Sequence, residues 1–388
     1  MGRLSMIPFE EYDTLSGAVM PSDALDHITI RGFKSIKSIE KLPLSAVNIL
    51  VGANGSGKSN FIGALSFLHE VREGRLQEYV RSSGGAEQVL HFGSKGTKQI
   101  HLDVSFIQGV NQYEVAFKPA ADDSLFVANE VVSFWERSIY SQPLRNRIAP
   151  VEGGREAGVS SASAVKITGW VRGRLGRFRL YHVHDTSSSS PMRKTSHLDD
   201  NQYLRPDGAN LGAFLFLLQE KHQPEYQLIR RAVQAVAPYF DDFSLRPDPL
   251  NEDSIRIAWK HKDSDQYFGA ASLSDGTLRF IVLATLFLQP QTYRPAAIVI
   301  DEPELGLHPA AIAMLAALVK QASVQTQVVL STQSALLLDH FEPEDILVAD
   351  RVDNATELRR VDAGRLSEWL DDYSLGQLWE KNEFGGRP

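Results

Sequence analysis

A glycine-rich loop of eight residues constrains the fold of this chain more than any other feature. Residues 52–59 read Gly-Ala-Asn-Gly-Ser-Gly-Lys-Ser and follow the apolar run Val47–Val51. A helical pattern of apolar residues begins at Phe61. A strand, a glycine loop ending in Gly-Lys-Ser and a helix together form a phosphate-binding loop, in which backbone N–H groups and the helix N-terminus surround a phosphate. The sequence therefore predicts an α/β fold built around a nucleoside triphosphate.

The loop residues also predict which side chains bind the nucleotide. Lys58 is expected to reach the terminal phosphates, and the Ser59 hydroxyl is expected to bind Mg²⁺. ATP and Mg²⁺ are therefore the predicted cofactors. The residues expected to line the phosphates are Gly52, Asn54, Gly55, Ser56, Gly57, Lys58, Ser59 and Asn60.

A second motif consists of the apolar, β-branched run 296–300 and the two acids after it, Asp301 and Glu302. Such a run is typical of a buried parallel strand, and α/β sheets bind ligands at the carboxyl ends of their strands. We expect Asp301 to hold Mg²⁺, directly or through water, and Glu302 to polarise the attacking water. The alternative is a solvated acidic loop, but it does not explain why both acids follow so apolar a strand.

A third motif, residues 273–280, reads Leu-Ser-Asp-Gly-Thr-Leu-Arg-Phe and lies just before an apolar helical stretch. It resembles the LSGGQ signature of the ABC ATPase superfamily. In that family the signature binds the γ-phosphate held by the other subunit. The resemblance implies that Ser274 and Gly276 contact nucleotide in trans, and that the chain forms a homodimer or a higher homo-oligomer.

Three further segments resemble the RecF, OLD and SMC-like branch of that superfamily. Residues 302–309 read Glu-Pro-Glu-Leu-Gly-Leu-His-Pro, where transporter subunits usually differ. Residues 28–36 are similar to the opening strand of RecF/SMC-like heads, which implies that Lys34 and Ser35 approach the nucleotide; an exposed basic turn is the alternative. Gln333 stands where the superfamily often has a switch histidine. Because glutamine donates hydrogen bonds but carries no charge, slow or partner-triggered ATP hydrolysis is expected.

Two other phrases, residues 204–211 and 373–380, are similar to a bacterial group of stand-alone AAA_21-like ATPases found beside nuclease or Toprim-like partners in phage-defence loci. This resemblance implies a switch ATPase that controls a separate effector protein. A RecF-like DNA-binding repair ATPase is one alternative. A transporter ATPase subunit is another, although the 302–309 segment and a long strand-rich insertion argue against it.

The organisation of the chain agrees with a compact ATPase head. We expect a leader at residues 1–24, an ATPase lobe at 25–118 with the phosphate-binding loop and antiparallel strands, an inserted mixed α/β lid at 119–272, and a second ATPase lobe at 273–388. No sustained heptad pattern is present, so a coiled-coil arm is not expected.

Charge and composition bear on partners and location. The chain has a net charge of −8, yet residues 137–182 hold nine Lys and Arg against two acids, so this basic region is predicted to bind nucleic acid or an acidic protein surface; a solvated hairpin face is the alternative. His182 and His184 share a face of one strand, but no third metal ligand is identifiable, so structural histidines are favoured. The longest apolar stretch, Phe280–Leu288, is too short to span a membrane, no signal pattern is present, and cysteine is absent. A cytoplasmic protein without membrane partners is expected.

Overall fold

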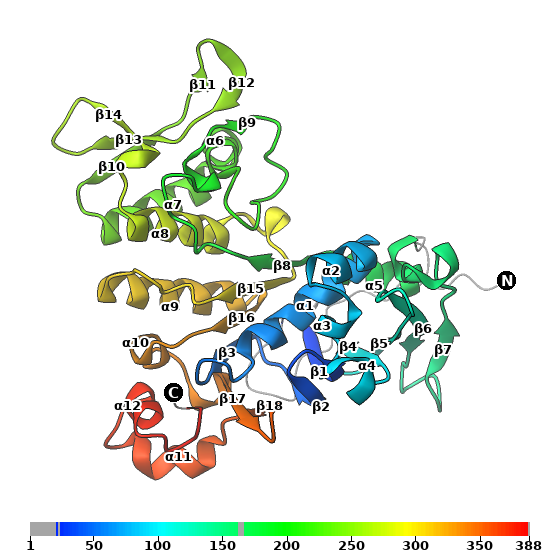
Figure 1. Cartoon of the computed structure of the whole chain (residues 1–388). Helices are drawn as coiled ribbons and strands as arrows, with labels where there is room; N and C mark the ends of the chain where they lie inside the picture. The colour runs from blue at the N-terminus through cyan, green and yellow to red at the C-terminus, as the bar shows by residue number, and fades with distance from the viewer. Residues whose placement is uncertain (1–20, 22–23, 162–166, 387–388) are drawn as a thin grey trace.

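A six-stranded sheet at the centre of the molecule carries the phosphate-binding loop (Figure 1). The computed structural model describes residues 21, 24–161 and 167–386, so the predicted leader lies almost entirely outside the described residues. All neighbouring strands of this sheet run parallel except the edge strand β18. In spatial order the strands are β18 (Ala355–Arg360), β17 (Ile346–Val352), β3 (Val47–Val51), β16 (Gln327–Ser331), β15 (Ala297–Asp301) and β8 (Phe178–Tyr181).

The apolar, β-branched sequences of these strands explain their central position. Every residue of β3 and β16 is buried, as is β15 up to Asp301. Strands with both faces covered read as continuous apolar runs, which is the pattern that predicted them. The predicted α/β architecture is therefore confirmed.

A second six-stranded sheet is entirely antiparallel and lies beside the first. Its alternating sequences bury one face against the core, as expected for an antiparallel sheet with one solvated side. In spatial order its strands are β2 (Ile36–Pro43), β1 (Leu25–Phe33), β4 (Ile100–Phe106), β5 (Asn111–Pro119), β6 (Leu125–Phe134) and β7 (Leu144–Arg147).

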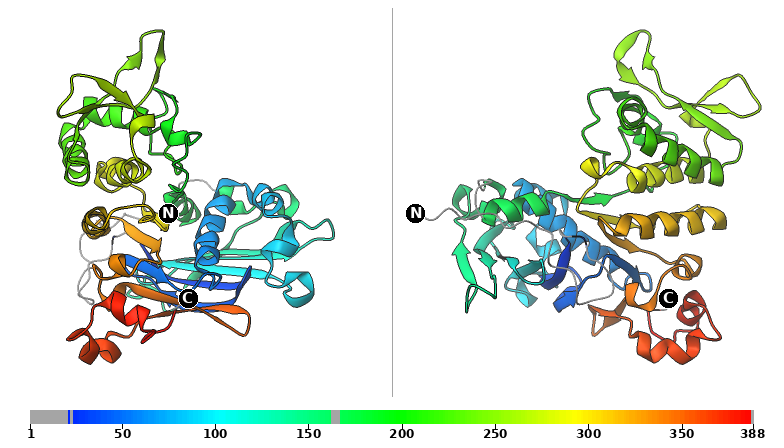
Figure 2. Two further views of the ribbon diagram at one scale, coloured as in Figure 1. Left: turned by 60° about the vertical axis from the view of Figure 1, so that its left-hand side comes forward. Right: turned by 180° about the vertical axis from the view of Figure 1, so that it is seen from behind.

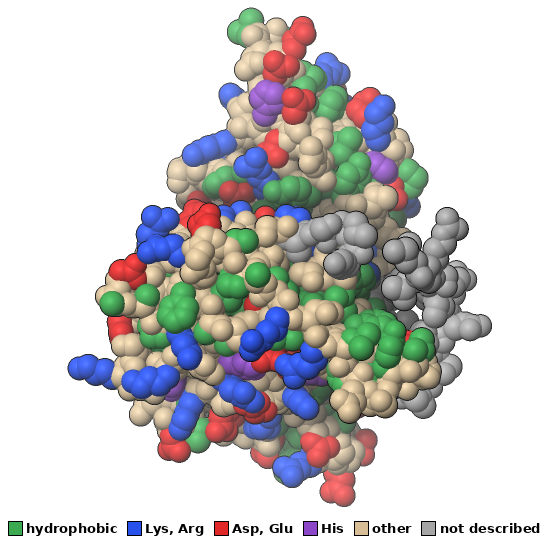
Figure 3. All heavy atoms as spheres, turned by 90° about the vertical axis from the view of Figure 1, so that its right-hand side faces the viewer, with side chains coloured by type: hydrophobic (Ala, Val, Ile, Leu, Met, Phe, Trp, Pro, Cys, Tyr) green, Lys and Arg blue, Asp and Glu red, His purple; other side chains and the backbone are tan. Residues whose placement is uncertain are grey.

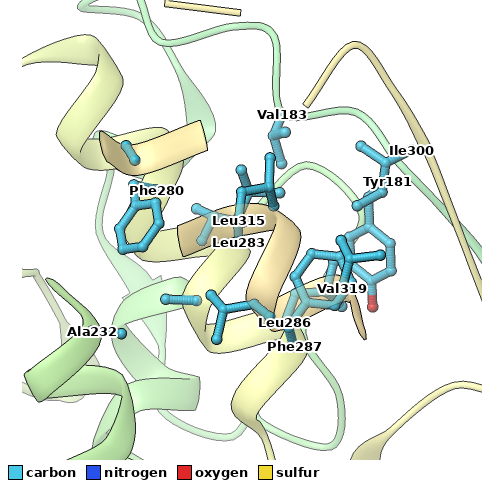
Figure 4. Packing of buried hydrophobic residues seen from close by; sticks show 14 of the residues in the cluster. Tyr181, Val183, Ala232, Phe280, Leu283, Leu286, Phe287, Ile300, Leu315 and Val319 are labelled. Carbon is cyan, nitrogen blue, oxygen red and sulfur yellow. The ribbon is translucent and has the colours of Figure 1, made fainter. Parts of the chain in front are cut away.

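The two faces of the central sheet pack into two separate cores. One core joins the sheet to α1 (Lys58–Glu73) and to the antiparallel sheet. The other joins it to α8 (Asp275–Leu288) and α9 (Pro309–Ser323). Helix α8 is buried from Thr277 to Leu288, and its Leu283 and Phe287 pack among residues of α9 and the central sheet (Figure 4). Because α8 is enclosed on all sides, its N-terminus has a fixed position relative to the sheet.

A helical lobe covers α8 on the side away from the central sheet (Figure 2). Strands β6, β7 and β8 fall within the range predicted for the inserted lid, yet they extend the two six-stranded sheets. The lobe consists of α6 (Leu211–Lys221), α7 (Gln223–Val236) and two small sheets, which contain β9 (Ser196–His197), β10 (Phe240–Ser244), β11 (Pro247–Asp248), β12 (Asn251–Ile255), β13 (Ala258–His261) and β14 (Tyr267–Gly269). The division of the chain into units at 24, 118 and 272 stays a prediction.

The remaining helices are short and lie around the two sheets (Figure 1). The longest helix of the described residues, α1, has 16 residues, and no coiled-coil arm occurs in the part of the chain that the structure describes. None of the described helices is long and apolar enough to cross a membrane. The short helices are α2 (Leu76–Ser82), α3 (Ala86–Val89), α4 (Gly93–Gly96), α5 (Ile167–Leu175), α10 (Ala335–Leu338), α11 (Ala363–Leu370) and α12 (Leu375–Glu380).

Candidate nucleotide site

The phosphate-binding loop connects the buried end of β3 to the first residue of α1. Gly55 and Gly57 have φ angles of 78° and 106°, which only glycine adopts without steric cost. A Cβ atom on Gly57 would collide with the side chain of Thr356, so this position also requires glycine for space. The loop therefore turns its backbone N–H groups inward at the N-terminus of a 16-residue helix, which is an arrangement that binds anions.

Lys58 is buried at the base of this loop. Its Nζ atom donates hydrogen bonds to the carbonyl oxygens of Gly52 (2.6 Å) and Ala53 (3.0 Å). Burial lowers the pKa of Lys58, and the carboxylates of Glu302 and Asp301 act in the opposite direction. The ammonium group is thus held next to the loop and the two acids, where a terminal phosphate would be bound.

Ser59 and Asp301 come together from different parts of the chain. Their side chains are connected by a hydrogen bond of 3.3 Å from the Ser59 hydroxyl to Asp301 Oδ2. Asp301 pairs with Ser331 in the register of β15 and β16, and the Ser331 hydroxyl donates to Asp301 Oδ1. A hydroxyl and a carboxylate oxygen are the hard ligands that Mg²⁺ prefers, so these residues fit this ion.

A buried hydroxyl in the loop also fits a phosphate. Ser56 is 3% exposed, and its Oγ atom has no hydrogen-bond partner among the described residues. A buried polar atom without a partner is costly in free energy. A phosphate oxygen would satisfy this hydroxyl.

Glu302 occupies an unusual backbone conformation directly after β15. Its φ angle is 40°, in the left-handed region that residues with a side chain rarely adopt. Its N–H donates to the Ser331 carbonyl (3.0 Å), and its carboxylate accepts a hydrogen bond from Gln333 Nε2. The turn brings Glu302, which was predicted to polarise the attacking water, into contact with Gln333, the residue at the position of the switch histidine.

Glu304 is a residue of this site to which the sequence analysis assigned no role. It is 8% exposed, and its Oε1 atom accepts hydrogen bonds from the Thr332 hydroxyl and the Gln333 N–H (3.3 Å). Burial raises the pKa of Glu304, and these hydrogen bonds oppose the rise. The carboxylate therefore ties the loop after β15 to the segment that carries Gln333.

The predicted signature lies at the N-terminus of α8. The Ser274 hydroxyl caps this helix by accepting from the Thr277 N–H (3.1 Å), and Ser274 is exposed. A Cβ atom on Gly276 would meet the Gly306 carbonyl, so α8 passes closely over the loop after β15. The buried guanidinium of Arg279 donates to the carbonyls of Val183 and His184 (both 2.9 Å). The signature is thus rigidly supported and open to another molecule.

Ser35 reaches the phosphate-binding loop, whereas Lys34 lies beside two aromatic rings. Asn60 Nδ2 donates to Ser35 Oγ (2.6 Å), and Ser35 Oγ lies 2.7 Å from Thr356 Oγ1. Because Thr356 donates its own proton to the Ser56 carbonyl (2.8 Å), Ser35 is the donor to Thr356. Lys34 is half-buried, with its Nζ about equally far from the rings of Phe33 (5.6 Å) and Tyr79 (5.7 Å), and burial lowers its pKa.

Thr356 and Arg351 are loop-binding residues that sequence reasoning missed. Both belong to the hairpin of β17 and β18. Thr356 binds the Ser56 carbonyl, as described above, and Arg351 Nη1 donates to the Gly55 carbonyl (3.4 Å). No local motif marks these residues, because their contacts join segments about 300 positions apart in the sequence. Only the pairing of β17 with β3 brings them together.

His182 follows β8, at the same edge of the central sheet as Asp301. The register pairs Tyr181 with Ile300, so the next residues, His182 and Asp301, lie at neighbouring strand ends. Burial lowers the pKa of His182, as does His184, and Asp301 acts in the opposite direction. Among the described residues, no group of three or more His, Asp or Glu side chains is arranged to hold a metal ion.

Comparisons with known proteins agree with this geometry. Residues 24–145 match the family described as "AAA ATPase domain" (AAA_15), and residues 182–339 match the family described as "AAA domain, putative AbiEii toxin, Type IV TA system" (AAA_21). These two segments contain the phosphate-binding loop and the acids after β15, respectively.

Curated relatives are similar to part of the chain. DNA replication and repair protein RecF of Pseudoalteromonas translucida is 32% identical over 89 residues, which are 23% of this chain and 24% of that protein. RecF of Myxococcus xanthus is 34% identical over 110 residues, which are 27% and 29% of the two chains. The chain thus spans about a quarter of the length of these relatives.

Two solved SMC heads share the fold over most of the chain. A head bound to the C-winged helix domain of ScpA has a TM-score of 0.58 at 16% identity and covers 88% of this chain and 98% of its own. A Pyrococcus furiosus head bound to the C-terminal domain of ScpA has a TM-score of 0.55 at 15% identity, with 90% and 98% covered. The chain therefore has the fold of an SMC-like ATPase head. Its segments are similar to AAA ATPase domains and to RecF, which agrees with the resemblance found in the sequence.

Proposed function

We propose that this protein binds ATP with Mg²⁺ and hydrolyses it as a two-chain switch that controls a partner effector. The observation that carries the proposal is the convergence of Ser59, Asp301, Glu302 and Gln333 at the carboxyl edge of the central sheet. These residues come from three segments of the sequence. Their proximity to Lys58 supports a site for a triphosphate and an attacking water.

Each residue has a defined part in the proposed reaction. The loop N–H groups, the Ser56 hydroxyl and Lys58 bind the phosphates and stabilise the charge that develops on them. Ser59 and Asp301 would hold Mg²⁺, which when bound neutralises the β- and γ-phosphates. Glu302 orients the attacking water, and Gln333 fixes the Glu302 carboxylate by a hydrogen bond. Because Gln333 lacks an imidazolium charge, hydrolysis is slow or depends on a partner.

Two chains associate head to tail in this proposal, and the exposed N-terminus of α8 supports it. Ser274 caps its own helix and faces solvent. The N-terminus of a helix that carries a serine and a glycine is an anion site. In the proposed dimer this site contacts the γ-phosphate on the loop of the other chain, so each nucleotide is enclosed by both copies.

Replacing Ser274 by arginine should block this contact without changing nucleotide binding by the single chain. The bulkier side chain occupies the exposed N-terminus of α8, so we expect ATP hydrolysis to fall by at least about tenfold. Steady-state phosphate release and equilibrium nucleotide titration measure the two effects. Ser367→Arg, at an exposed position on α11, is the matched control. Normal hydrolysis by Ser274→Arg would contradict the head-to-tail dimer.

The effector is proposed to be a separate nuclease or Toprim-like protein in anti-phage defence. The match to a family whose description names a toxin of a toxin–antitoxin system supports this role. A nuclease centre needs a cluster of acidic side chains. The adjacent acids Asp371 and Asp372 are too few to form such a centre. In this proposal another chain cleaves the nucleic acid, and the nucleotide-bound dimer restrains or releases that chain.

A RecF-like ATPase that binds DNA directly is the second candidate. The RecF relatives and the basic region 137–182 favour it. The structure spreads the described part of this region over β7, α5 and β8, and residues 170–179 form the end of a helix, a turn and a strand instead of a hairpin. Lys166 lies outside the described residues. Figure 3 shows Lys and Arg side chains gathered over the lower part of one face, with acids among them.

Several arginines of this region already have partners within the chain. Arg145 pairs with Glu114 (2.7 Å), and Arg155 pairs with Asp122 (3.0 Å). Arg174 stacks on Trp170, and burial lowers its pKa to about 10. Arg147 and Arg177 are both exposed, and Arg177 Nη2 also donates to the Arg294 carbonyl (3.3 Å). Their exposure makes these two arginines candidates for phosphate contacts.

If the second candidate is correct, the double variant Arg147→Glu/Arg177→Glu should bind nucleic acid with a weaker dependence on salt. Each lost phosphate contact lowers the slope of log affinity against log salt by about one unit. Binding to a fluorescent DNA duplex across a salt series measures the slope, and Arg231→Glu on α7 is the matched control. An unchanged slope, or a wild-type chain that binds no nucleic acid, would favour control of an effector over direct DNA binding.

A further inference from the structure

The segment Phe384–Gly386 is held by two hydrogen bonds to the hairpin of β17 and β18 and by one hydrogen bond from α12. Arg359 of β18 donates to the Phe384 carbonyl, and the Gly386 N–H donates to Asp350 Oδ1 of β17 (2.9 Å). The indole Nε1 of Trp379 in α12 donates to the Gly386 carbonyl (3.1 Å). Phe384 and Trp379 are both buried. The segment is therefore a built part of the fold.

This segment passes directly over the start of the phosphate-binding loop. A Cβ atom on Gly386 would lie 3.4 Å from Gly52 Cα and 3.0 Å from Val348 Cγ1. Gly385 and Gly386 have φ angles of 84° and 73°, so glycine permits both the turn and the close approach. Gly52 is also confined by β17, because a Cβ atom on Gly52 would collide with the Ala349 carbonyl.

Gly52 is also the residue that positions the lysine of the site. Its carbonyl oxygen accepts the 2.6 Å hydrogen bond from Lys58 Nζ. The segment contacts the hairpin of β17 and β18, and this hairpin in turn binds the loop at two points. Arg351 donates to the Gly55 carbonyl, and Thr356 donates to the Ser56 carbonyl. A displacement of Phe384–Gly386 would therefore release both Gly52 and the hairpin that supports the loop.

We propose that Phe384–Gly386 locks the phosphate-binding loop in its nucleotide-binding conformation, so that nucleotide affinity depends on the seating of this segment. This inference rests on the proposed function for the identity of the ligand. Gly386 and Trp379 are positioning residues, which act through Gly52 and Asp350. Because such coupling is reciprocal, bound nucleotide also stabilises the seated segment, and a partner that withdraws the segment weakens nucleotide binding.

Gly386→Ala in the full chain tests the proposal. The added Cβ meets Val348 and requires a left-handed alanine, so we expect about tenfold weaker binding of a fluorescent non-hydrolysable ATP analogue with Mg²⁺. Trp379→Phe keeps most of the ring packing but removes one hydrogen bond, and about threefold weaker binding is expected. Gly364→Ala is the matched control, because Gly364 is exposed at the start of α11 and its Cβ would contact only Asp362 Oδ1, at 3.3 Å.

Hydrogen exchange separates this coupling from a loss of overall stability. The Gly386 amide should exchange more slowly in wild-type protein when the analogue is bound, and it should not respond in Lys58→Ala. Two results would overturn this inference alone, provided that the wild-type chain binds nucleotide. One is an unchanged affinity in both Gly386→Ala and Trp379→Phe. The other is an exchange rate of the Gly386 amide that does not respond to nucleotide. A wild-type chain that binds no nucleotide would reject the proposed function and this inference together.

Discussion

Lys58→Ala should lower the affinity for ATP by about a hundredfold or more. The substitution removes a buried ammonium group that lies next to the loop carbonyls and would contact the terminal phosphates. Hydrogen bonds to charged groups contribute about 1.5–3 kcal/mol each, and 1.4 kcal/mol corresponds to a factor of ten. Isothermal titration with ATP and Mg²⁺ measures the loss.

Lys262→Ala is the control for this variant. Lys262 is exposed beyond β13 in the helical lobe, so its removal should leave nucleotide binding unchanged. Undiminished affinity in Lys58→Ala would refute the assignment of the phosphate-binding loop. The same pair of variants tests the defence role in cells that also carry the neighbouring genes. Protection against phage should be lost in Lys58→Ala and kept in Lys262→Ala.

Glu302→Gln should abolish turnover while nucleotide binding persists. The amide cannot accept a proton from the attacking water, and the loss of a general base typically reduces the rate by about 10²–10⁴-fold. Since the phosphate ligands remain in place, the variant should accumulate as the ATP-bound dimer. Phosphate release and light scattering after gel filtration with ATP are the two measurements.

Glu357→Gln, an exposed position on β18, is the matched control for the charge change. It should retain hydrolysis and should not accumulate a dimer. If Glu302→Gln remains a monomer at saturating ATP, the two-chain switch is wrong even if the hydrolysis assignment survives. If it hydrolyses ATP at the wild-type rate, another residue orients the water.

The expected slow hydrolysis depends on how Gln333 contacts Glu302. Its side chain donates to the Glu302 carboxylate, where a histidine would also bring a titratable charge. Glu304 holds the Gln333 backbone through a buried carboxylate. The position of Gln333 is therefore well determined, and the proposed slow hydrolysis follows from its chemistry and not from its placement.

The sequence by itself predicted the phosphate-binding loop, the acids at the end of β15 and the kind of fold that holds them. Residues 52–59 and the run 296–302 are local patterns, because a phosphate-binding loop needs only a strand, glycines and a helix that are adjacent in the chain. Their order relative to the signature at Ser274 indicated an ABC-type head, and the fold agrees. The central strands were also predictable, since strands buried on both faces are continuously apolar.

Only the tertiary structure decided which distant residues complete the site. Thr356, Arg351 and the segment Phe384–Gly386 reach the loop because β17 pairs with β3, and strand pairing across about 300 residues leaves no local pattern. The basic region shows the opposite case. Its charges were plain in the sequence, but the fold spreads them over β7, α5 and β8 and pairs Arg145 and Arg155 with acids. Sequence patterns show which residue types are adjacent in the chain. The burial of a side chain and its ion pairs and strand partners depend on how the whole chain packs.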